Sequence, residues 1–309
     1  MRRVLAVHFA PCALFVAGVL ALMRAGSFSG RSDWEAVWPQ RPTAILGVIS
    51  TVVVCSALLG LLLQPFQVRA VRVLEGYWDR WSLTAGLAEA LARVQRRRWE
   101  ALRRRAHEVA DGSRHLRVRA DARRRLAARP PVEALLPTAL GNALRSGELT
   151  AGERYGLTTL SSWPRIYPQV SDRLAEGLRS GRDALDTAVN LCWSFLALTG
   201  ASAFALYDEP PVWWLCGVGL LMAGVAYKGA VTVAQGYSGL MHIVYDLHRF
   251  DLLEALHYPL PADRASEAEV FSDLSDLFAG MAPEGRGYEH PDASGRSAEA
   301  QDNGKPTGA

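Results

Sequence analysis

Residues 43–66, TAILGVISTVVVCSALLGLLLQPF, are an apolar run without a charged side chain. A helix needs about 20 apolar residues to cross the hydrocarbon core of a bilayer. Three further runs reach or approach that length, at residues 4–23, 188–207 and 212–234. The sequence therefore predicts an all-α fold with four transmembrane helices.

The first run follows Arg2 and Arg3 and has to be distinguished from a cleavable signal peptide. The apolar core of a signal peptide spans about 7–15 residues and is followed by a small-x-small cleavage site. The run at 4–23 is longer, and Met23-Arg24-Ala25 at its end is a poor cleavage site. We therefore expect a retained transmembrane helix.

The distribution of positive charge predicts the orientation of the chain. The formal net charge is only +3, yet arginine dominates residues 67–130 and forms three RRR triplets there. Basic residues that flank membrane spans stay on the cytoplasmic side. With the first basic residues inside, the four spans form two hairpins in the plasma membrane and both termini lie in the cytoplasm. The loops at 24–42 and 208–211 then lie outside.

The chain is thus expected to have five parts: a first transmembrane hairpin (1–66), an Arg-rich cytoplasmic helical region (67–187), a second transmembrane hairpin (188–234), a cytoplasmic helical extension (235–281) and a disordered tail (282–309). The tail is rich in Gly, Ser and acidic residues and has little apolar surface to bury. A helix from Ser171 is expected to run into the third span, and the fourth span is expected to continue as a helix to His257.

The tryptophans and cysteines add to this interpretation. Tryptophan prefers the headgroup layer of a membrane, so six tryptophans next to the spans are expected to mark interfaces. The cysteines lie one in each span, without metal-ligand spacing, and are expected to behave as small hydrophobic residues. A disulfide between two of these cysteines inside the bilayer is kept as an alternative. We expect no cofactor or metal. The tryptophans are Trp34, Trp38, Trp78, Trp81, Trp213 and Trp214, and the cysteines are Cys12, Cys55, Cys192 and Cys216.

Ionisable side chains are almost absent from the four runs. Pumps and selective ion channels usually carry carboxylates, histidines or charged rings at membrane depth. Here His8 lies near the start of the first run and Lys228 lies in the fourth, while the notable polar groups of the third are Asn190, Ser194, Thr199 and Ser202. This composition argues against a transporter or channel, which we keep as an alternative.

Residues 82–110 are predicted to form an amphipathic helix, and a second Arg-rich helix is expected to end before Pro130. Most arginines of the first helix face away from its apolar stripe, whereas Arg98 and Arg105 fall inside it. The surface over Arg96–Arg125 is either a solvated cytoplasmic face or a site for anionic headgroups or a cytoplasmic protein. Nucleic acid is the least favoured partner for this surface, because positive charge without a recognised binding motif is weak evidence.

The segment 153–168, ERYGLTTLSSWPRIYP, joins two predicted helical regions. Pro164 and Pro168 favour extended backbone in the residues that precede them. The segment is either a structural corner, which we favour, or a ligand cradle in which arginines bind an anionic group and aromatic rings stack. On the helix after the fourth span, His242, Asp246, Arg249 and His257 fall on one face. The His–Asp pair one turn apart either binds a metal or shuttles protons, or is an ordinary solvated pair, which we favour. The candidate residues are Arg145, Glu153, Arg154, Tyr155, Trp163, Arg165, His242, Asp246 and Arg249.

Four motifs lie between and after the two hydrophobic hairpins: LGNALR (140–145), ERYG (153–156), WPRIYP (163–168) and YDLHRFDLLEAL (245–256). As a set they resemble a group of uncharacterised actinobacterial integral membrane proteins, over roughly residues 40–257. The resemblance implies a membrane protein of high-GC Gram-positive bacteria. It implies no activity and no catalytic residue.

The sequence favours a non-enzymatic membrane protein that docks a partner or anionic lipid. A small transporter or channel is the second hypothesis. The third is a membrane-embedded enzyme acting on a lipid or an anionic ligand, with Arg145, Arg154, Arg165 and the His242 face as its candidate groups.

Overall fold

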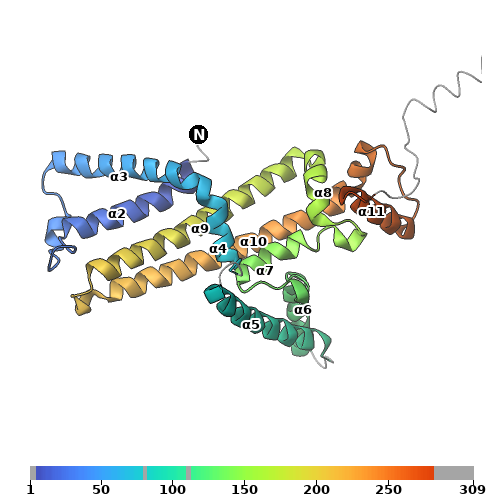
Figure 1. The fold of residues 1–309 in the computed structure, drawn as a ribbon, viewed down its shortest axis with the longest axis horizontal. Coiled ribbons are helices and arrows are strands. Elements are labelled where there is room, and N and C mark those ends of the chain that lie inside the picture. Colours follow the sequence, from blue (N-terminus) through green and yellow to red (C-terminus); the bar gives the residue numbers. More distant parts are fainter. Residues whose placement is uncertain (1–4, 79–81, 109–112, 282–309) are drawn as a thin grey trace, which may run out of the picture. The chain divides into compact units, whose positions relative to one another are not determined.

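The computed structural model describes residues 5–78, 82–108 and 113–281. The described residues are mostly helical and contain no strand, so the predicted all-α fold is confirmed. Figure 1 labels the helices and colours them along the sequence, from blue at the N-terminus to red at the C-terminus. The expectations for Arg2, Arg3, Trp81 and the tail at 282–309 fall outside the described residues.

Within the described ranges, four helical segments are long and apolar enough to cross a membrane, as predicted: Val7–Arg24, Pro42–Glu75, Asp172–Ala205 and Pro210–Ala255. The first contains most of a π-helical turn, Leu5–Phe9, and α2, Ala10–Arg24. The second contains α3, Pro42–Leu63, a 3-10 turn at Gln64–Phe66, and α4, Gln67–Glu75. The chain has the composition and helix lengths of a multi-pass membrane protein.

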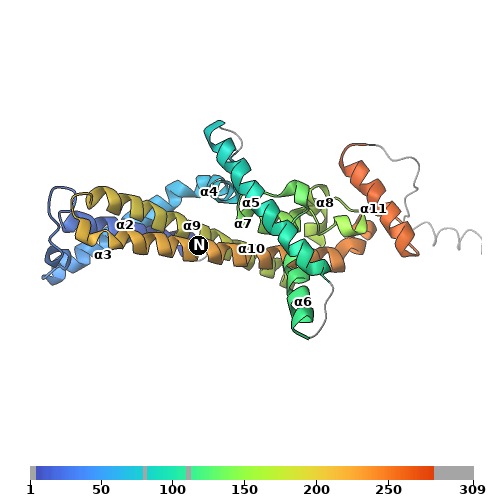
Figure 2. The ribbon, with the colours of Figure 1, turned by 90° about the horizontal axis from the view of Figure 1, so that it is seen from below.

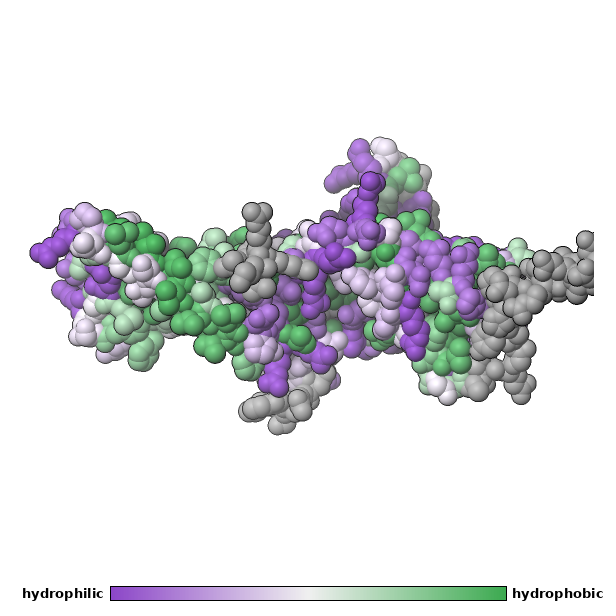
Figure 3. Space-filling view, turned by 90° about the horizontal axis from the view of Figure 1, so that it is seen from above, coloured by the Kyte–Doolittle hydropathy of each residue, from purple (hydrophilic) through white to green (hydrophobic). Residues whose placement is uncertain are grey.

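The surface of these helices supports a lipid environment. Leu46, Leu61 and Leu62 on α3 are 65%, 60% and 69% exposed. Hydrophobic residues gather over the candidate spans in Figure 3, and hydrophilic residues lie at their loop end. Apolar surface of this extent is costly in water, whereas lipid chains cover it at no such cost.

The chain divides into two compact units. Unit 1 comprises residues 1–146 and 177–238, and unit 2 comprises 147–176 and 239–309. Three helices contribute to both units: α7 (Ala139–Glu148), α9 (Asp172–Ala205) and α10 (Trp214–Ala255). The predicted helical extensions before the third span and after the fourth are therefore present.

In unit 1, α2 packs against α3, and Figures 1 and 2 show α9 and α10 side by side. The buried core joins α4, α7, α9 and α10. Helices α5 (Ser82–His107) and α6 (Ser113–Ala127) pack on each other, and Arg123 Nε donates to the carbonyl oxygen of Ala106 at 3.2 Å. A 3-10 turn at Val132–Ala134 follows α6.

A close backbone contact fixes the start of α7 against the end of α4. The hydroxyl of Thr138 donates to the carbonyl oxygen of Glu75 at 2.6 Å. A Cβ added at Gly141 would lie 2.1 Å from that same oxygen, so only glycine fits. Gly76 ends α4 with a φ of 96°, in the left-handed region.

Unit 2 contains α8 (Thr159–Ile166), α11 (Arg264–Phe278) and the end of α10. Two 3-10 turns, Glu153–Tyr155 and Tyr167–Gln169, flank α8. Its core consists of fully buried side chains from these elements and from the loop before α8: Leu157, Ile166, Tyr245, Leu252, Leu253, Phe271 and Leu274.

The expectation of extended backbone before the two prolines is wrong. Pro164 lies inside α8, and Tyr167, which precedes Pro168, is helical with φ −56° and ψ −38°. The helical turn places Ile166 in the core with no exposed surface, and it leaves Leu160 60% exposed. Burial in unit 2 thus outweighs the local preference that a following proline imposes.

We predict that Gly141→Ala lowers the free energy of unfolding by about 1–3 kcal/mol, because the new methyl group would overlap the Glu75 carbonyl oxygen. The measurement is thermal unfolding of the full chain in mild detergent. Gly236→Ala on α10 is the matched control, since a Cβ there meets nothing within 4 Å. Equal melting temperatures for the two variants would contradict the contact.

Candidate functional site

Asp246 is the centre of the predicted cluster in unit 2. Its Oδ1 accepts a hydrogen bond from the Tyr155 hydroxyl at 2.5 Å and one from Arg154 Nη2 at 2.9 Å. Arg154 also donates to the carbonyl oxygens of Ala151 and His242, at 3.3 and 3.2 Å. Burial and the hydrogen bond to Asp246 raise the pKa of Tyr155, so this phenol stays a neutral donor.

Arg249 connects α10 to α11. Its Nε donates to Glu267 Oε1 at 2.7 Å, and the two side chains are only 18% and 13% exposed. Its guanidinium lies 4.4 Å from the ring centroid of Tyr155 and 4.3 Å from that of Phe250. It also donates to the carbonyl oxygen of Asp246. A planar cation suits this arrangement, because it stacks on rings while its edge donates hydrogen bonds.

Glu153 organises the start of α8. Its carboxylate accepts from the backbone N–H of Thr159 at 3.1 Å and from the Thr159 hydroxyl at 2.6 Å. A carboxylate at the first turn of a helix satisfies backbone donors and complements the helix dipole. Gly156 ends the preceding turn with a φ of 87°.

The aromatic residues of the segment pack inside unit 2. The ring of Trp163 lies 5.8 Å from that of Tyr167 and 6.3 Å from that of Tyr245. The Arg165 guanidinium lies 4.2 Å from the centroid of the Phe278 ring. Its Nη1 also donates to the carbonyl oxygen of Ser161 at 2.6 Å.

The structure therefore brings eight of the nine candidate residues into unit 2, and places Arg145 in unit 1. Arg145 Nη1 donates to the carbonyl oxygen of Ala134 at 2.8 Å, and its guanidinium lies 5.6 Å from the centroid of the Tyr77 ring. His242 and Asp246 have different partners, since His242 Nε2 lies 2.9 Å from the Thr150 hydroxyl. The guanidinium and carboxylate groups of the cluster form hydrogen bonds and ion pairs with other groups of the chain. This geometry favours a structural corner over a ligand cradle.

The second candidate site is the arginine hairpin, which we define as α5, α6 and Arg129. Twelve of the fourteen arginines between residues 82 and 129 are exposed, including Arg98 and Arg105. Asp121 pairs with Arg124 and Arg125, at 2.6 and 2.7 Å. The hairpin thus presents far more guanidinium groups than carboxylates.

Arg129 is the least solvated part of this positive surface. Its Nη1 atom is buried and has no hydrogen-bond partner. Burial, and then the positive charges of Arg98 and Arg125, lower the pKa of Arg129. A buried donor that faces other cations is stabilised by a bound anion.

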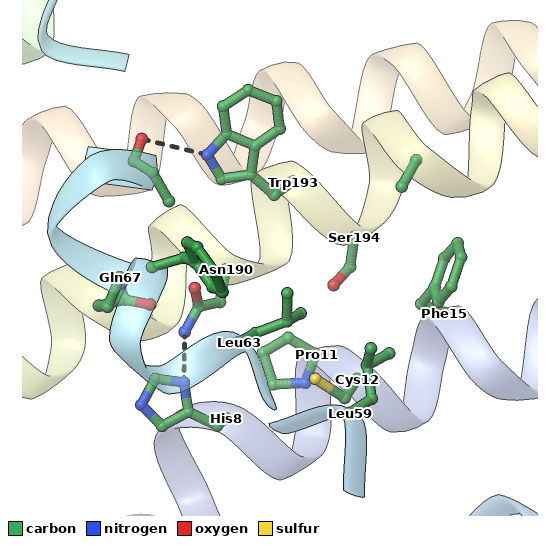
Figure 4. Close-up of a pocket in the computed structure, with 13 residues that line it drawn as sticks. His8, Pro11, Cys12, Phe15, Leu59, Leu63, Gln67, Asn190, Trp193 and Ser194 are labelled. Atoms are coloured by element: carbon green, nitrogen blue, oxygen red, sulfur yellow. Dashed lines mark hydrogen bonds between the residues drawn. The ribbon is translucent and has the colours of Figure 1, made fainter. Parts of the chain in front are cut away.

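A third candidate is a cavity of about 310 Å³ in unit 1 (Figure 4). Asn190 Nδ2 donates to the Val7 carbonyl oxygen at 3.3 Å and lies 3.2 Å from His8 Nδ1. Trp193 Nε1 donates to the carbonyl oxygen of Ala70 at 3.2 Å. The lining residues are His8, Pro11, Cys12, Phe15, Leu59, Leu63, Phe66, Gln67, Ala70, Asn190, Trp193, Ser194 and Ala197.

The sequence noted His8 and Asn190 separately and missed the cavity. One signal was present: His8, Gln67 and Asn190 each lie close to one end of an apolar run. These are the start of the first run, the end of the second and the start of the third. When successive spans run in opposite directions, these three ends lie on the same side of the membrane and close to one another. The four cysteines are free thiols, so none of them forms the disulfide that the sequence left open.

No family model, no curated protein and no solved structure matches the chain. The resemblance to actinobacterial membrane proteins thus stays a prediction.

We predict that Arg249→Lys loosens α11, because lysine keeps the charge but loses the planar stack on Tyr155 and Phe250. The cost is about 1 kcal/mol. Hydrogen exchange of the full chain in detergent should show faster exchange in 264–278 and no change in α3. Arg93→Lys, at an exposed arginine of α5, is the control. Unchanged exchange in α11 would contradict the role of Arg249.

Proposed function

We propose that this chain is a multi-pass protein of the plasma membrane that docks its arginine hairpin onto anionic lipid headgroups. The observation that carries the proposal is the unbalanced charge of the hairpin. Fourteen arginines and five acidic residues between 82 and 129 give a formal net charge of +9. Each basic residue near an anionic leaflet contributes about 1 kcal/mol to binding.

Exposed apolar side chains on the same helices support this choice. Leu87 and Val94 on α5 are 54% and 41% exposed, and Leu116 and Val118 on α6 are 49% and 50% exposed. Helices that lie in a membrane interface combine arginines with apolar residues in this way. A purely solvated face would gain nothing from these apolar side chains, so the combination favours a lipid surface over bulk water.

Two contacts support the arrangement of the spans as two hairpins. The backbone N–H and the hydroxyl of Ser32 both donate to Glu209 Oε1, at 2.6 and 2.7 Å. The loop after the first span and the loop after the third therefore lie together in unit 1. Trp38, Trp213 and Trp214 are exposed near these loops, where an interfacial position suits their rings.

The positive-inside rule then supports cytoplasmic placement of the arginine hairpin and of both termini. The arginine hairpin is the next helical region after the second span, which ends with α4. The cytoplasmic leaflet carries the anionic lipids, so charge and location agree. Within this proposal the cluster around Asp246 is structural.

Hydrogen exchange of the full chain in nanodiscs tests the docking. We expect slower exchange in α5 and α6 with one quarter phosphatidylglycerol than with phosphatidylcholine alone. The difference should vanish in about 1 M salt, where the Debye length falls to about 3 Å. Equal exchange in both lipids at low salt would contradict lipid docking and leave an acidic protein as the partner to test.

A charge variant sharpens this test. Replacing Arg103, Arg104 and Arg105 by glutamine removes about 3 kcal/mol of attraction, or about 100-fold in the docking equilibrium. Arg41→Gln, in the loop before α3, is the control and should leave the exchange of α5 and α6 unchanged. A similar loss in both variants would show that the arginine hairpin has no special role.

The orientation has its own prediction. In a chain whose native cysteines are alanine, Ser29→Cys should react with an impermeant maleimide on intact cells, because its loop is proposed to lie outside. Ser113→Cys, at the start of α6, should react only after the cells are permeabilised. Both serines are exposed, so accessibility within the protein is matched. The reverse labelling would rule out the orientation.

A further inference from the structure

The cavity of Figure 4 lies among the first three candidate spans, in unit 1, and is mostly apolar. Its residues come from the π-helical turn at Leu5–Phe9, α2, the end of α3, the 3-10 turn at Gln64–Phe66, the start of α4 and the middle of α9. A volume of about 310 Å³ is at the lower end of the range for small-ligand sites, about 300–1,000 Å³. The cavity is large enough for part of a small or chain-like molecule.

Its polar and apolar residues separate along the helices. On α9 the lining runs from Asn190 to Ala197, and at the first span it runs from His8 to Phe15. Seven residues of helix cover about 10 Å. In Figure 4, His8, Gln67 and Asn190 gather at one end, and Phe15 lies at the other. The cavity thus has a polar end, and its apolar part extends from that end parallel to the spans.

Gln67 supplies a donor that the protein does not use. Its Nε2 atom is buried and has no hydrogen-bond partner. An amide nitrogen can only donate, so it needs an oxygen or another acceptor. By contrast, the donors of Asn190 and Trp193 are bound to backbone carbonyl oxygens. Because buried polar groups are nearly always paired, the Gln67 nitrogen indicates an acceptor supplied by a ligand.

The lining residues restrict the charge of that ligand. They include no arginine, lysine, aspartate or glutamate. A carboxylate or phosphate at the Gln67 end would be a poorly compensated buried charge. The ligand therefore has an uncharged acceptor next to a hydrocarbon chain. Gln67 follows the apolar part of the second span, at the boundary between hydrocarbon and headgroups. An acyl lipid has its ester carbonyl at that depth.

We propose that this cavity holds one acyl chain of a membrane lipid and that Gln67 donates a hydrogen bond to the ester carbonyl of that chain. The site is separate from the arginine hairpin and recognises the linkage and the chain of the lipid instead of its headgroup. The chain lies along Leu59, Leu63 and Phe15, and the carbonyl lies at the end where Gln67 and Asn190 meet.

Photolabelling of the full chain in detergent tests the site. The probes are two phosphatidylcholines with a diazirine near the end of one chain, one ester-linked and one ether-linked. Mass spectrometry should find the ester probe on peptides that contain Phe15, Leu59 or Ala197. The ether probe, which lacks the carbonyl, should label them about fivefold less, the effect of losing one hydrogen bond. Equal labelling by the two probes would overturn the recognition of the carbonyl.

Two variants complete the test. Gln67→Met keeps the side-chain length and removes the donor, so the ester preference should disappear. Gln64→Met is the matched control on the preceding turn, because Gln64 is exposed and does not line the cavity. Ser194→Leu fills the cavity and should reduce labelling by both probes. Gel filtration and circular dichroism confirm that each variant is folded.

Some results would refute the proposal. Labelling of the same peptides that Gln67→Met and Ser194→Leu leave unchanged would show lipid bound nonspecifically on the outer surface of the spans. Absence of label from these peptides would show that no chain enters. Because the phosphatidylcholine headgroup has no net charge, neither result depends on the proposed docking of the arginine hairpin.

Discussion

The backbone of the spans must satisfy its own hydrogen bonds, because hydrocarbon offers no partners. Each unsatisfied N–H or C=O at that depth costs several kcal/mol, which leaves the helix as the available local structure. Two prolines at the starts of spans obey this constraint. Pro42 opens α3, and Pro210 opens the 3-10 turn Pro210–Val212 that precedes α10. A proline there sacrifices no hydrogen bond, since the first N–H groups of a helix have no intrahelical partner.

The same constraint explains the polar side chains at the ends of the spans. Trp193 gives its N–H to the Ala70 carbonyl oxygen, and Asn190 gives its amide to the Val7 carbonyl oxygen. These bonds tie α9 to α4 and to the first span. Gln67 is the exception among these side chains, since its nitrogen is buried and has no partner. A buried donor without a partner that lines a cavity is informative about a ligand.

The spans could be predicted from composition alone, because length and apolarity are properties of a segment. The continuation of α9 and α10 beyond the apolar runs was predictable in the same way, from helix-forming residues next to each run. The contact between Gly141 and the Glu75 carbonyl could not be predicted, because it depends on where α4 and α7 meet in three dimensions. Arg249 was placed correctly on a helix face, but its partner Glu267 lies on another helix, which periodicity does not reveal. The extended backbone expected before Pro164 was wrong for the opposite reason: the burial of Ile166 in the core of unit 2 outweighs the local preference that a following proline imposes.

The two proposed lipid sites follow from one difference in solvent. The guanidinium groups of the arginine hairpin are exposed to water, so the repulsion between them is weak. Each of them adds to the attraction between the hairpin and an anionic surface. Inside the cavity a single charge would be unfavourable, and recognition is left to one uncharged donor and to apolar contact. An anionic headgroup would therefore favour the hairpin and avoid the cavity, whereas an ester-linked chain would do the reverse. Because a phospholipid carries both chemistries, a protein with two such sites can hold lipids of one leaflet by their headgroups and by their chains independently.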